Sequence, residues 1–292
     1  MNSLEDFAAI TLRDEPLAPL TWLKVGGPAQ RLIQPRSVDE LAAVIRVCHE
    51  NKITVHMLGG GSNLLVRDEG VSGVVIRLSD PAFSKVTIEG TRLRAGGGAM
   101  LSHVITESVK AGLAGLDTLV GIPGTIAGAL KGNAGGRNGE IGEHVHSVTV
   151  ITAQGEKFVR QGDELVFEYR HSSINELCVV EAEFELTKDT PDDIAERMHK
   201  LWVMKKSTQP LSFQSAGCVF KNPRGLSAGA LIEQAGLKGM KIGKCEVSDR
   251  HGNFIITEPG AKSADVLKLI DVMKTKVAEA HGVELQLEIQ VW

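Results

Sequence analysis

Hydrophobic residues recur every three or four positions along two long stretches, 37–51 and 263–280, and this spacing predicts an amphipathic helix in each. Ser37 and Glu40 form a capping box at the start of the first helix, and Gly282 lies just past the end of the second. Three further helices are predicted over 100–110, 190–206 and 227–235.

Alternation of hydrophobic and polar residues predicts strands over much of the remaining chain. Within 178–187 the hydrophobic positions alternate with Glu181, Glu183 and Glu185, which we expect to form a solvated face. The last strand is predicted over 284–292, with its odd-numbered hydrophobic residues directed inward. The other predicted strands and hairpins lie at 21–35, 53–58, 74–78, 85–95, 144–160 and 252–257.

The helix over 190–206 is our candidate domain boundary. It follows a run of strands, has a polar side and carries its apolar positions at Ile194, Met198, Leu201 and Trp202. We therefore expect two domains, residues 1–200 and residues 201–292. Strands first and mixed elements afterwards favour an α+β fold over a doubly wound sheet.

Two glycine-rich loops are the strongest functional signal. Residues 121–139 contain seven glycines, and Gly59, Gly60 and Gly61 follow the apolar run 53–58. Dense glycines expose backbone N–H groups and permit positive φ, which suits a loop that wraps a diphosphate. We therefore expect both loops to be phosphate cradles that the surrounding strands and helices bring together. The alternative is that these glycines only make turns. The spacing matches neither the dinucleotide fingerprint G-x-G-x-x-G nor a P-loop.

Composition and charge narrow the possible partners. The net charge of the 292-residue chain is −4, without a long basic run, so we expect no nucleic-acid partner. The four cysteines are far apart and form no C-x-x-C pair, so we expect neither a disulfide framework nor a zinc site. This use of cysteine fits a protein of the reducing cytosol best. The apolar stretch 111–130 contains Asp117, Pro123 and five glycines, so we expect no membrane span.

Three residues could do chemistry by their type and position. Arg170 follows an apolar run and could meet a carboxylate or an enolate, Cys218 lies among small residues and could donate a proton, and Glu288 lies on a polar strand face. The alternatives are a surface ion pair, a small buried hydrophobe and a solvated carboxylate. His144 and His146 could begin a metal site, but no third ligand is evident, so no metal is expected.

Seven motifs follow one another along the chain: GGGSN at 59–63, GIPGT at 121–125, NAG at 133–135, YRHS at 169–172, SAGCVFKNP at 215–223, AGLKG at 235–239 and the terminal LQLEI. In this order, and from Trp22 to Val291, the chain resembles the UDP-N-acetylenolpyruvoylglucosamine reductase (MurB) family. The short connection after Arg170 resembles the type II branch of that family, which lacks a tyrosine-bearing insertion.

The resemblance implies a fold and a reaction. It implies an FAD-binding domain of the vanillyl-alcohol-oxidase, or PCMH, kind, followed by a smaller α+β substrate domain. NADPH would reduce FAD, and the reduced flavin would pass hydride to UDP-N-acetylglucosamine enolpyruvate, giving UDP-N-acetylmuramate for peptidoglycan. NADPH and the small-molecule substrate would use the same site in turn, in a cytoplasmic monomer without membrane or nucleic-acid partners.

The resemblance also implies roles for individual residues. Arg170 and Glu288 would stabilise an enolate-like intermediate, Cys218 would be the proton donor in place of the usual serine, and Asn222 and His251 would contact substrate. The residues expected to bind FAD are Gly59, Gly60, Gly61, Ser62, Asn63, Leu64, Gly121, Pro123, Gly124, Thr125 and Gly128.

Two positions depart from the family pattern. Gln290 stands where many members carry a basic residue, so one substrate contact would be missing or supplied elsewhere. Lys131-Gly132 replaces an apolar residue and a methionine, which could reshape the flavin edge. Two other functions stay open on the pattern alone: an FAD-dependent oxidase that uses oxygen, and a non-catalytic nucleotide-binding protein.

Overall fold

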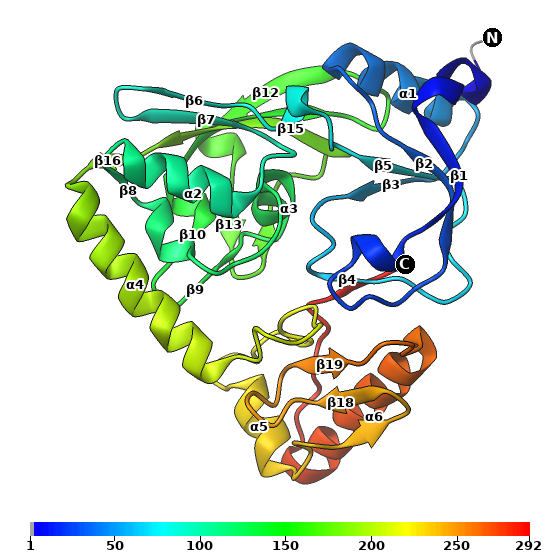
Figure 1. The fold of residues 1–292 in the computed structure, drawn as a ribbon, viewed down its shortest axis with the longest axis vertical. Coiled ribbons are helices and arrows are strands. Elements are labelled where there is room, and N and C mark those ends of the chain that lie inside the picture. The colour runs from blue at the N-terminus through cyan, green and yellow to red at the C-terminus, as the bar shows by residue number, and fades with distance from the viewer. Residues whose placement is uncertain (1–2) are drawn as a thin grey trace. The chain divides into compact units, whose positions relative to one another are not determined.

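The structure, a computed structural model, describes residues 3–292 and divides into two compact units (Figure 1). The first unit comprises the chain up to Arg13, residues 31–60 and residues 73–204. The second unit comprises residues 14–30, 61–72 and 205–292. Strands and helices are mixed in the chain, which confirms the predicted α+β class.

A five-stranded antiparallel sheet is the centre of the first unit, with strand order β12-β11-β15-β7-β6. Helices α2 and α3 pack on one face of it through a core that includes Leu101, Val104, Ile126 and Phe184. The predicted hairpins at 85–95 and 144–160 are confirmed. The elements are β6 (Val86–Glu89), β7 (Arg92–Gly96), β11 (Val145–Ile151), β12 (Lys157–Gln161), β15 (Cys178–Glu185), α2 (Leu101–Lys110) and α3 (Ile126–Lys131).

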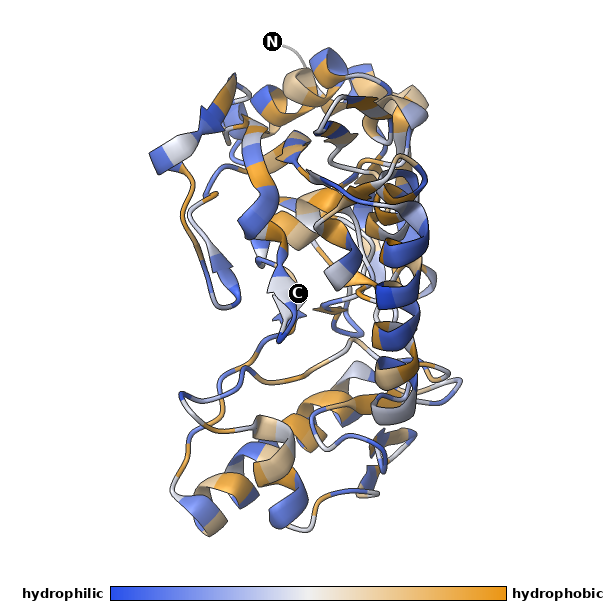
Figure 2. Ribbon diagram, turned by 90° about the vertical axis from the view of Figure 1, so that its left-hand side faces the viewer, coloured by the Kyte–Doolittle hydropathy of each residue, from blue (hydrophilic) through white to orange (hydrophobic). Residues whose placement is uncertain are grey.

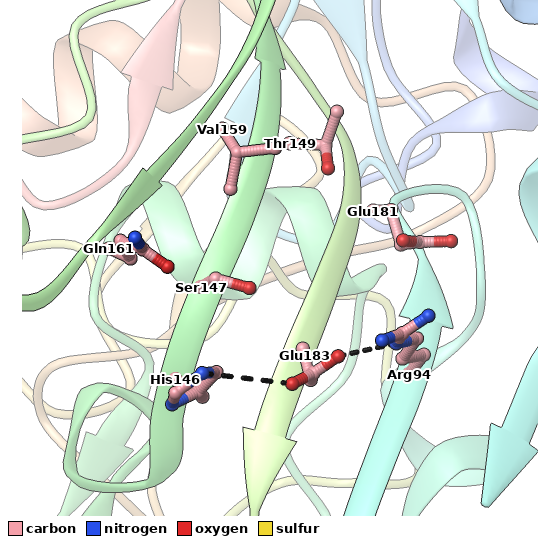
Figure 3. A pocket seen from close by; sticks show the side chains of 8 residues that line it. All are labelled: Arg94, His146, Ser147, Thr149, Val159, Gln161, Glu181 and Glu183. Carbon is pink, nitrogen blue, oxygen red and sulfur yellow. Dashed lines mark hydrogen bonds and ion pairs between the residues drawn. The ribbon is translucent and has the colours of Figure 1, made fainter.

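The opposite face of this sheet is polar but not uniformly solvated. Glu183 is only 7% exposed, because Arg92 and Arg94 on the neighbouring strand both bond to its carboxylate. Figure 3 shows the carboxylate between Arg94 and His146, in a pocket of about 330 Å³. The expectation of a solvated face is therefore wrong for Glu183, since alternation gives the face of a residue but not its ion pairs.

A four-stranded sheet has the order β1-β2-β5-β3, and β2, β5 and β3 run parallel. The predicted helix at 37–51 is confirmed as α1 (Val38–Glu50), with the Ser37 side chain accepting from Glu40 N at 3.1 Å. The buried residues of α1 and of this sheet form one apolar core. The strands are β1 (Thr11–Pro16), β2 (Pro28–Ile33), β3 (Val55–Leu58) and β5 (Val74–Arg77).

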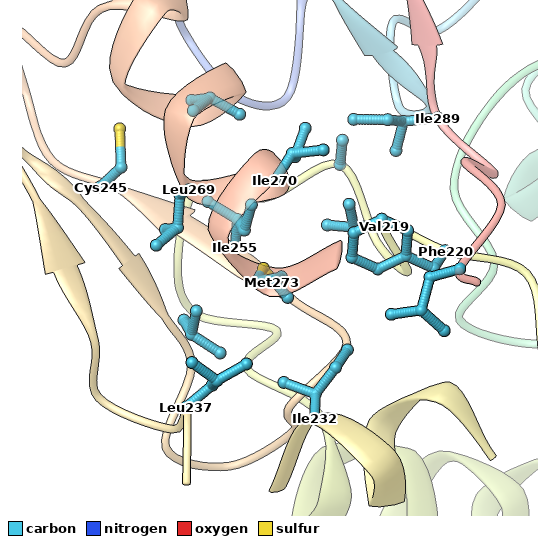
Figure 4. Packing of buried hydrophobic residues seen from close by; sticks show 14 of the residues in the cluster. Val219, Phe220, Ile232, Leu237, Cys245, Ile255, Leu269, Ile270, Met273 and Ile289 are labelled. Carbon is cyan, nitrogen blue, oxygen red and sulfur yellow. The ribbon is translucent and has the colours of Figure 1, made fainter. Parts of the chain in front are cut away.

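The core of the second unit lies between helices α5 and α6 and a three-stranded sheet, β17-β18-β19. Figure 4 shows Val219 and Phe220 among the residues of this core, together with Met273 and Ile289. Both predicted helices are confirmed, and Gly282 ends α6 in the left-handed conformation. The elements are α5 (Ala228–Gln234), α6 (Ser263–His281), β17 (Lys241–Ile242), β18 (Cys245–Val247) and β19 (Ile255–Thr257).

The C-terminal segment differs from the single strand predicted over 284–292. Leu285 and Ile289 are buried as expected, but regular pairing is confined to β20 (Gln290–Val291), which runs parallel to β4 (Leu64–Leu65). The segment bonds to loops instead of a neighbouring long strand. Other two-residue ladders are β9 (Gly135–Gly136) with β10 (Gly139–Glu140), β13 (Phe167–Glu168) with β14 (His171–Ser172), and β8 (Leu113–Ala114) with β16 (Thr187–Lys188).

Helix α4 (Pro191–Thr208) belongs to the first unit up to Met204 and is largely hydrophilic along its length (Figure 2). Ile194 is buried, whereas Trp202 is 40% exposed, so the expected apolar side is covered only near its N-terminal end. Six 3-10 helices complete the described chain: Leu4–Ile10, Ala18–Leu20, Pro81–Phe83, Leu116–Leu119, Ile141–His144 and Gly162–Glu164. Within residues 3–292, no helix combines the length and the apolar character that a membrane crossing needs.

Candidate functional site

The two glycine loops, far apart in sequence, lie against each other in the first unit. A Cβ atom on Gly60 would come within 2.8 Å of the Gly124 Cα atom, and one on Gly59 within 2.8 Å of the Thr125 hydroxyl. Real Cβ atoms essentially never approach other atoms this closely, so any side chain here would force the loops apart. The prediction that the fold brings the two loops together is confirmed.

The second loop is fixed by the connection before α2 and by its own helix. Leu101 N donates to Gly124 O at 2.9 Å, and Ile126 N donates to Ala99 O at 2.9 Å. Thr125 caps α3, with its hydroxyl accepting from Gly128 N at 3.4 Å. A rigid glycine cradle of this kind suits a diphosphate, because backbone N–H groups can approach the ligand without intervening side chains.

The predicted FAD-binding residues are divided between the units. Gly59 and Gly60 belong to the first unit with residues 121–128, and residues 61–64 belong to the second. Gly59, Gly60, Ser62, Gly121 and Pro123 are partly exposed, as a binding surface requires, and Gly128 is exposed. Gly61, Leu64, Gly124 and Thr125 are buried, and Asn63 is exposed.

Arg170 occupies the two-residue turn between β13 (Phe167–Glu168) and β14 (His171–Ser172) in the first unit. Its φ is +55°, in the left-handed region that costs a non-glycine residue about 1–2 kcal/mol. Its guanidinium carbon lies 5.1 Å from the centre of the Tyr169 ring. A backbone held in such a conformation requires support from its surroundings and is common at functional sites.

Cys218 and Glu288 come together in the second unit although 70 positions separate them. Cys218 makes an antiparallel bridge with Phe254, and the next residue, Val219, accepts from Glu288 N at 2.8 Å and donates to Asn253 O at 2.9 Å. The segment that carries Cys218 is thus hydrogen-bonded on both sides. The structure therefore juxtaposes the predicted proton donor and the predicted carboxylate through backbone pairing.

Within the second unit, Asn63 bonds to the C-terminal segment that carries Glu288. Its side-chain Nδ2 donates to Glu288 O at 3.0 Å, and its carbonyl accepts from Gln290 N at 3.0 Å. The pairing continues between β4 (Leu64–Leu65) and β20 (Gln290–Val291). A residue predicted to bind FAD therefore contacts the backbone of a residue predicted to be catalytic.

Asn253, for which the sequence predicted no role, holds the segment that carries Cys218 in place by hydrogen bonds. It is 2% exposed, and its carboxamide bonds twice to Phe220: Phe220 N donates to Oδ1 at 2.9 Å, and Nδ2 donates to Phe220 O at 2.7 Å. An asparagine within His251-Gly252-Asn253 gives no periodic signal, and its partner lies 33 positions away. Only the fold reveals this role.

His251 and Asn222 were predicted to contact substrate, and both have structural contacts. His251 Nδ1 accepts from Asn253 N at 3.2 Å, and Asn222 Oδ1 accepts from Ala228 N at 2.9 Å. Burial, reinforced by the positive charge of Lys238, lowers the pKa of His251. His251 is therefore a neutral imidazole at neutral pH, with Nδ1 as an acceptor.

Burial separates Cys218 from the other cysteines. Cys48, Cys178 and Cys245 are buried, whereas Cys218 is partly exposed. Burial raises the pKa of Cys48 to about 11 and those of Cys178 and Cys245 to about 12. These three thiols stay protonated and inaccessible, and Cys218 is the thiol that a reactant could reach.

The described residues contain no cluster of three or more histidine, cysteine or acidic side chains arranged to hold a metal. His144 ends a 3-10 helix and its ring packs close to Gly115, while His146 lies in β11 with Nε2 3.8 Å from the Glu183 carboxylate. The two histidines thus have separate structural surroundings.

Comparison with known proteins agrees with this geometry. A family model described as "UDP-N-acetylenolpyruvoylglucosamine reductase, C-terminal domain" matches residues 209–292, and an FAD binding domain model matches residues 29–159. The UDP-N-acetylenolpyruvoylglucosamine reductase of Heliobacterium modesticaldum is 42% identical, over 98% of this chain and 92% of that protein. The enzyme of the same name from Moorella thermoacetica is 41% identical, over 96% and 93%.

A solved structure gives the same result. The crystal structure of UDP-N-acetylenolpyruvylglucosamine reductase (MurB) from Thermus caldophilus matches with a TM-score of 0.83 and 37% identity, covering 97% of this chain and 98% of that one. The family-model matches include both glycine loops and the Cys218 segment. The chain therefore belongs to the UDP-N-acetylenolpyruvoylglucosamine reductase family.

Proposed function

We propose that this protein uses FAD and NADPH to reduce UDP-N-acetylglucosamine enolpyruvate to UDP-N-acetylmuramate, a step in peptidoglycan precursor synthesis. The observation that carries the proposal is family membership over nearly the whole chain. One relative is 42% identical over 98% of this chain. The packed pair of glycine loops supports it independently, because it supplies a cradle for the FAD diphosphate.

The FAD site is assigned to the two glycine loops. Bound FAD would accept hydride from NADPH and deliver it to the enolpyruvyl double bond. The chain would hold the diphosphate with the backbone of residues 59–64 and 121–128, where the contact of Gly60 with Gly124 leaves no space for side chains. The substrate and NADPH would occupy one site in turn.

Three side chains are assigned to the substrate half of the reaction. Hydride addition to one carbon of the double bond leaves an electron pair that the neighbouring carboxylate can delocalise as an enolate. Arg170 and Glu288 would stabilise this enolate-like species. The Cys218 thiol would then donate its proton to the second carbon and regain one from solvent, which completes the addition of two hydrogens. A thiol with an ordinary pKa of about 8.5 is a better proton donor than an alcohol.

Asn222 and His251 are assigned to substrate binding. Asn222 is exposed, and His251 is partly exposed with a neutral ring that can take part in hydrogen bonding. Gln290 is also exposed. Its amide is uncharged, so electrostatic attraction for an anionic substrate would come from other residues.

We assign FAD binding to a domain of residues 1–200 and substrate binding to a domain of residues 201–292. Segments 14–30 and 61–72 pack with the second unit and would support the substrate domain. We further propose a cytoplasmic monomer with no membrane or nucleic-acid partner, because its substrate and NADPH are water-soluble small molecules. The net charge of −4 without a basic run is consistent with this assignment.

A product analysis tests the proposed reaction. Purified protein, FAD, NADPH and the enolpyruvyl substrate should give a product two hydrogen masses heavier than the substrate, with one NADPH consumed per product. Oxygen-dependent turnover of an alcohol without NADPH would instead indicate an oxidase of the same fold. Ligand binding without any turnover would indicate a nucleotide-binding protein that is not an enzyme.

A further inference from the structure

Lys131 is an unusual residue for the place it occupies. It is the last residue of α3 (Ile126–Lys131), and its side chain is half-buried in the first unit. Its Nζ donates to Ile174 O at 2.9 Å and also to Glu176 O. Burial lowers the pKa of this amine, and the Glu176 charge opposes the shift. A cation is therefore held in a costly position to bind two backbone carbonyls.

The segment that Lys131 binds directly follows the hairpin that carries Arg170. From the other direction, the Ser172 hydroxyl donates to Lys131 O at 3.1 Å. The backbone of Lys131 is thus bonded to the strand after Arg170, and its side chain is bonded to the segment that follows that strand. Ser172 is 4% exposed, so its bond is shielded from water.

The strand before Arg170 is also hydrogen-bonded to the chain at the C-terminal end of α3. Asn133 is fully buried with a φ of +43°, and its Nδ2 donates to Glu168 O at 3.0 Å. Its Oδ1 accepts from Gly142 N at 3.0 Å, which fixes the orientation of the amide. Residues 131–133 are therefore hydrogen-bonded to both strands of the hairpin. One strand precedes and the other follows Arg170, whose backbone is in the left-handed conformation.

Helix α3 has the glycine cradle at its other end. Thr125, its N-cap, contacts the first glycine loop at Gly59, and the helix then spans only six residues to Lys131. A helix this short bends little, so its two ends keep a fixed position relative to each other. The cradle for the FAD diphosphate and the Arg170 turn are thus two ends of one rigid connection.

We propose that Lys131 is a positioning residue that holds Arg170 in register with the flavin by clamping the β13–β14 hairpin to the end of α3. The proposal rests on the proposed function, in which Arg170 stabilises the enolate-like species. In this role Lys131 acts through Arg170, since its hydrogen bonds go to Ile174, Glu176 and Ser172.

The test is a double-mutant cycle on the two half-reactions of the holoenzyme, followed anaerobically by flavin absorbance. Lys131→Met keeps the length and removes the donors. We expect it to slow flavin reoxidation by the enolpyruvyl substrate about tenfold, with flavin reduction by NADPH changed less than twofold. In an Arg170→Ala background, Lys131→Met should have no further effect on reoxidation, because the residue through which it acts is gone.

Matched variants separate positioning from general stability. Lys110→Met makes the same change at the last residue of α2, where the side chain is 66% exposed, and should leave both half-reactions unchanged. Ser172→Ala removes the weaker tie and should slow reoxidation about threefold, which also provides a test if Lys131→Met fails to fold.

Two results would overturn the proposal. Equal slowing of both half-reactions, or an undiminished effect of Lys131→Met in the Arg170→Ala background, would reduce Lys131 to a structural role. A wild-type protein that performs neither half-reaction would instead overturn the proposed function and, with it, any role of Lys131 in that reaction.

Discussion

The glycine cradle of the first unit and the Cys218 segment of the second unit are built by different means. In the cradle, backbone meets backbone because side chains are missing: Gly60 could not approach Gly124 this closely if it carried a Cβ atom. In the Cys218 segment, side chains add to the backbone pairing: Val219 and Phe220 are buried, and the Asn253 carboxamide bonds to the backbone of Phe220.

This difference explains which site could be recognised from sequence. A glycine cradle leaves a visible composition, whereas a segment held by distant partners leaves none. It also separates the expected consequences of mutation. Changes in the cradle should affect cofactor retention, and changes around Cys218 should affect chemistry or local stability while flavin stays bound.

The largest effect is expected at the proton donor. Cys218→Ala removes the thiol, and loss of a general acid typically costs about 10²–10⁴-fold in rate. Stopped-flow absorbance should show flavin reoxidation by substrate slowed by this factor, while flavin reduction by NADPH and the bound flavin stay near normal. Cys218→Ser, which restores a hydroxyl donor, should recover part of the rate. Unchanged turnover in Cys218→Ala would remove the thiol from the mechanism.

The next effect is expected in the cradle. Gly60→Ala places a Cβ atom 2.8 Å from Gly124 Cα, and backbone must move to accommodate it. We expect FAD affinity to fall tenfold or more, about 1.4 kcal/mol, measured by fluorescence titration of the apoprotein. Gly136→Ala is the matched control, because a Cβ atom there meets nothing within 4 Å. Equal losses in both variants would contradict the close-packed cradle.

A moderate effect on stability is expected at Asn253. Asn253→Ala leaves the buried backbone groups of Phe220 without their partner, which costs about 1–3 kcal/mol in the free energy of unfolding. Urea denaturation should detect the loss, and Cys218 should react faster with a thiol reagent because its segment is looser. Asn175→Ala, at an exposed position, should change neither quantity. A stable variant with unchanged thiol reactivity would contradict the role of Asn253.

The smallest effect is a pH dependence from His251. Burial lowers the pKa of His251 below the usual 6.5, so the unfolded chain binds this proton more readily than the folded one. Its contribution to stability is complete above pH 6.5 and declines as the pH falls through that value. His251→Asn should therefore lose less melting temperature between pH 7 and pH 5 than wild type does. His199→Asn, at an exposed site of α4, serves as the control.

Much of the fold followed from hydrophobic spacing. The helices at 37–51 and 263–280 and the hairpins at 85–95 and 144–160 were predicted because a single face of each element packs against a core. Periodicity failed where burial depends on partners. It could not show that Arg92 and Arg94 would bury Glu183, or that the apolar positions at the end of α4 would stay exposed.

The candidate site was predicted in part. The contact between the two glycine loops was expected, because both had the composition of a phosphate cradle. The proximity of Cys218 to Glu288 was accessible only through family resemblance, since backbone pairing at Val219 joins residues without a shared pattern. The support of the Arg170 turn by Lys131 and Asn133 was not expected, because it depends on single side chains reaching distant carbonyls.

The most direct test of the central claim is the visible spectrum of the purified protein, followed anaerobically through additions of NADPH and then the enolpyruvyl substrate. Flavin bands should bleach when NADPH is added and return when substrate is added, because one hydride passes through the bound flavin. A colourless protein that also fails to take up added FAD would contradict the account, and the glycine cradle would then require another phosphate ligand.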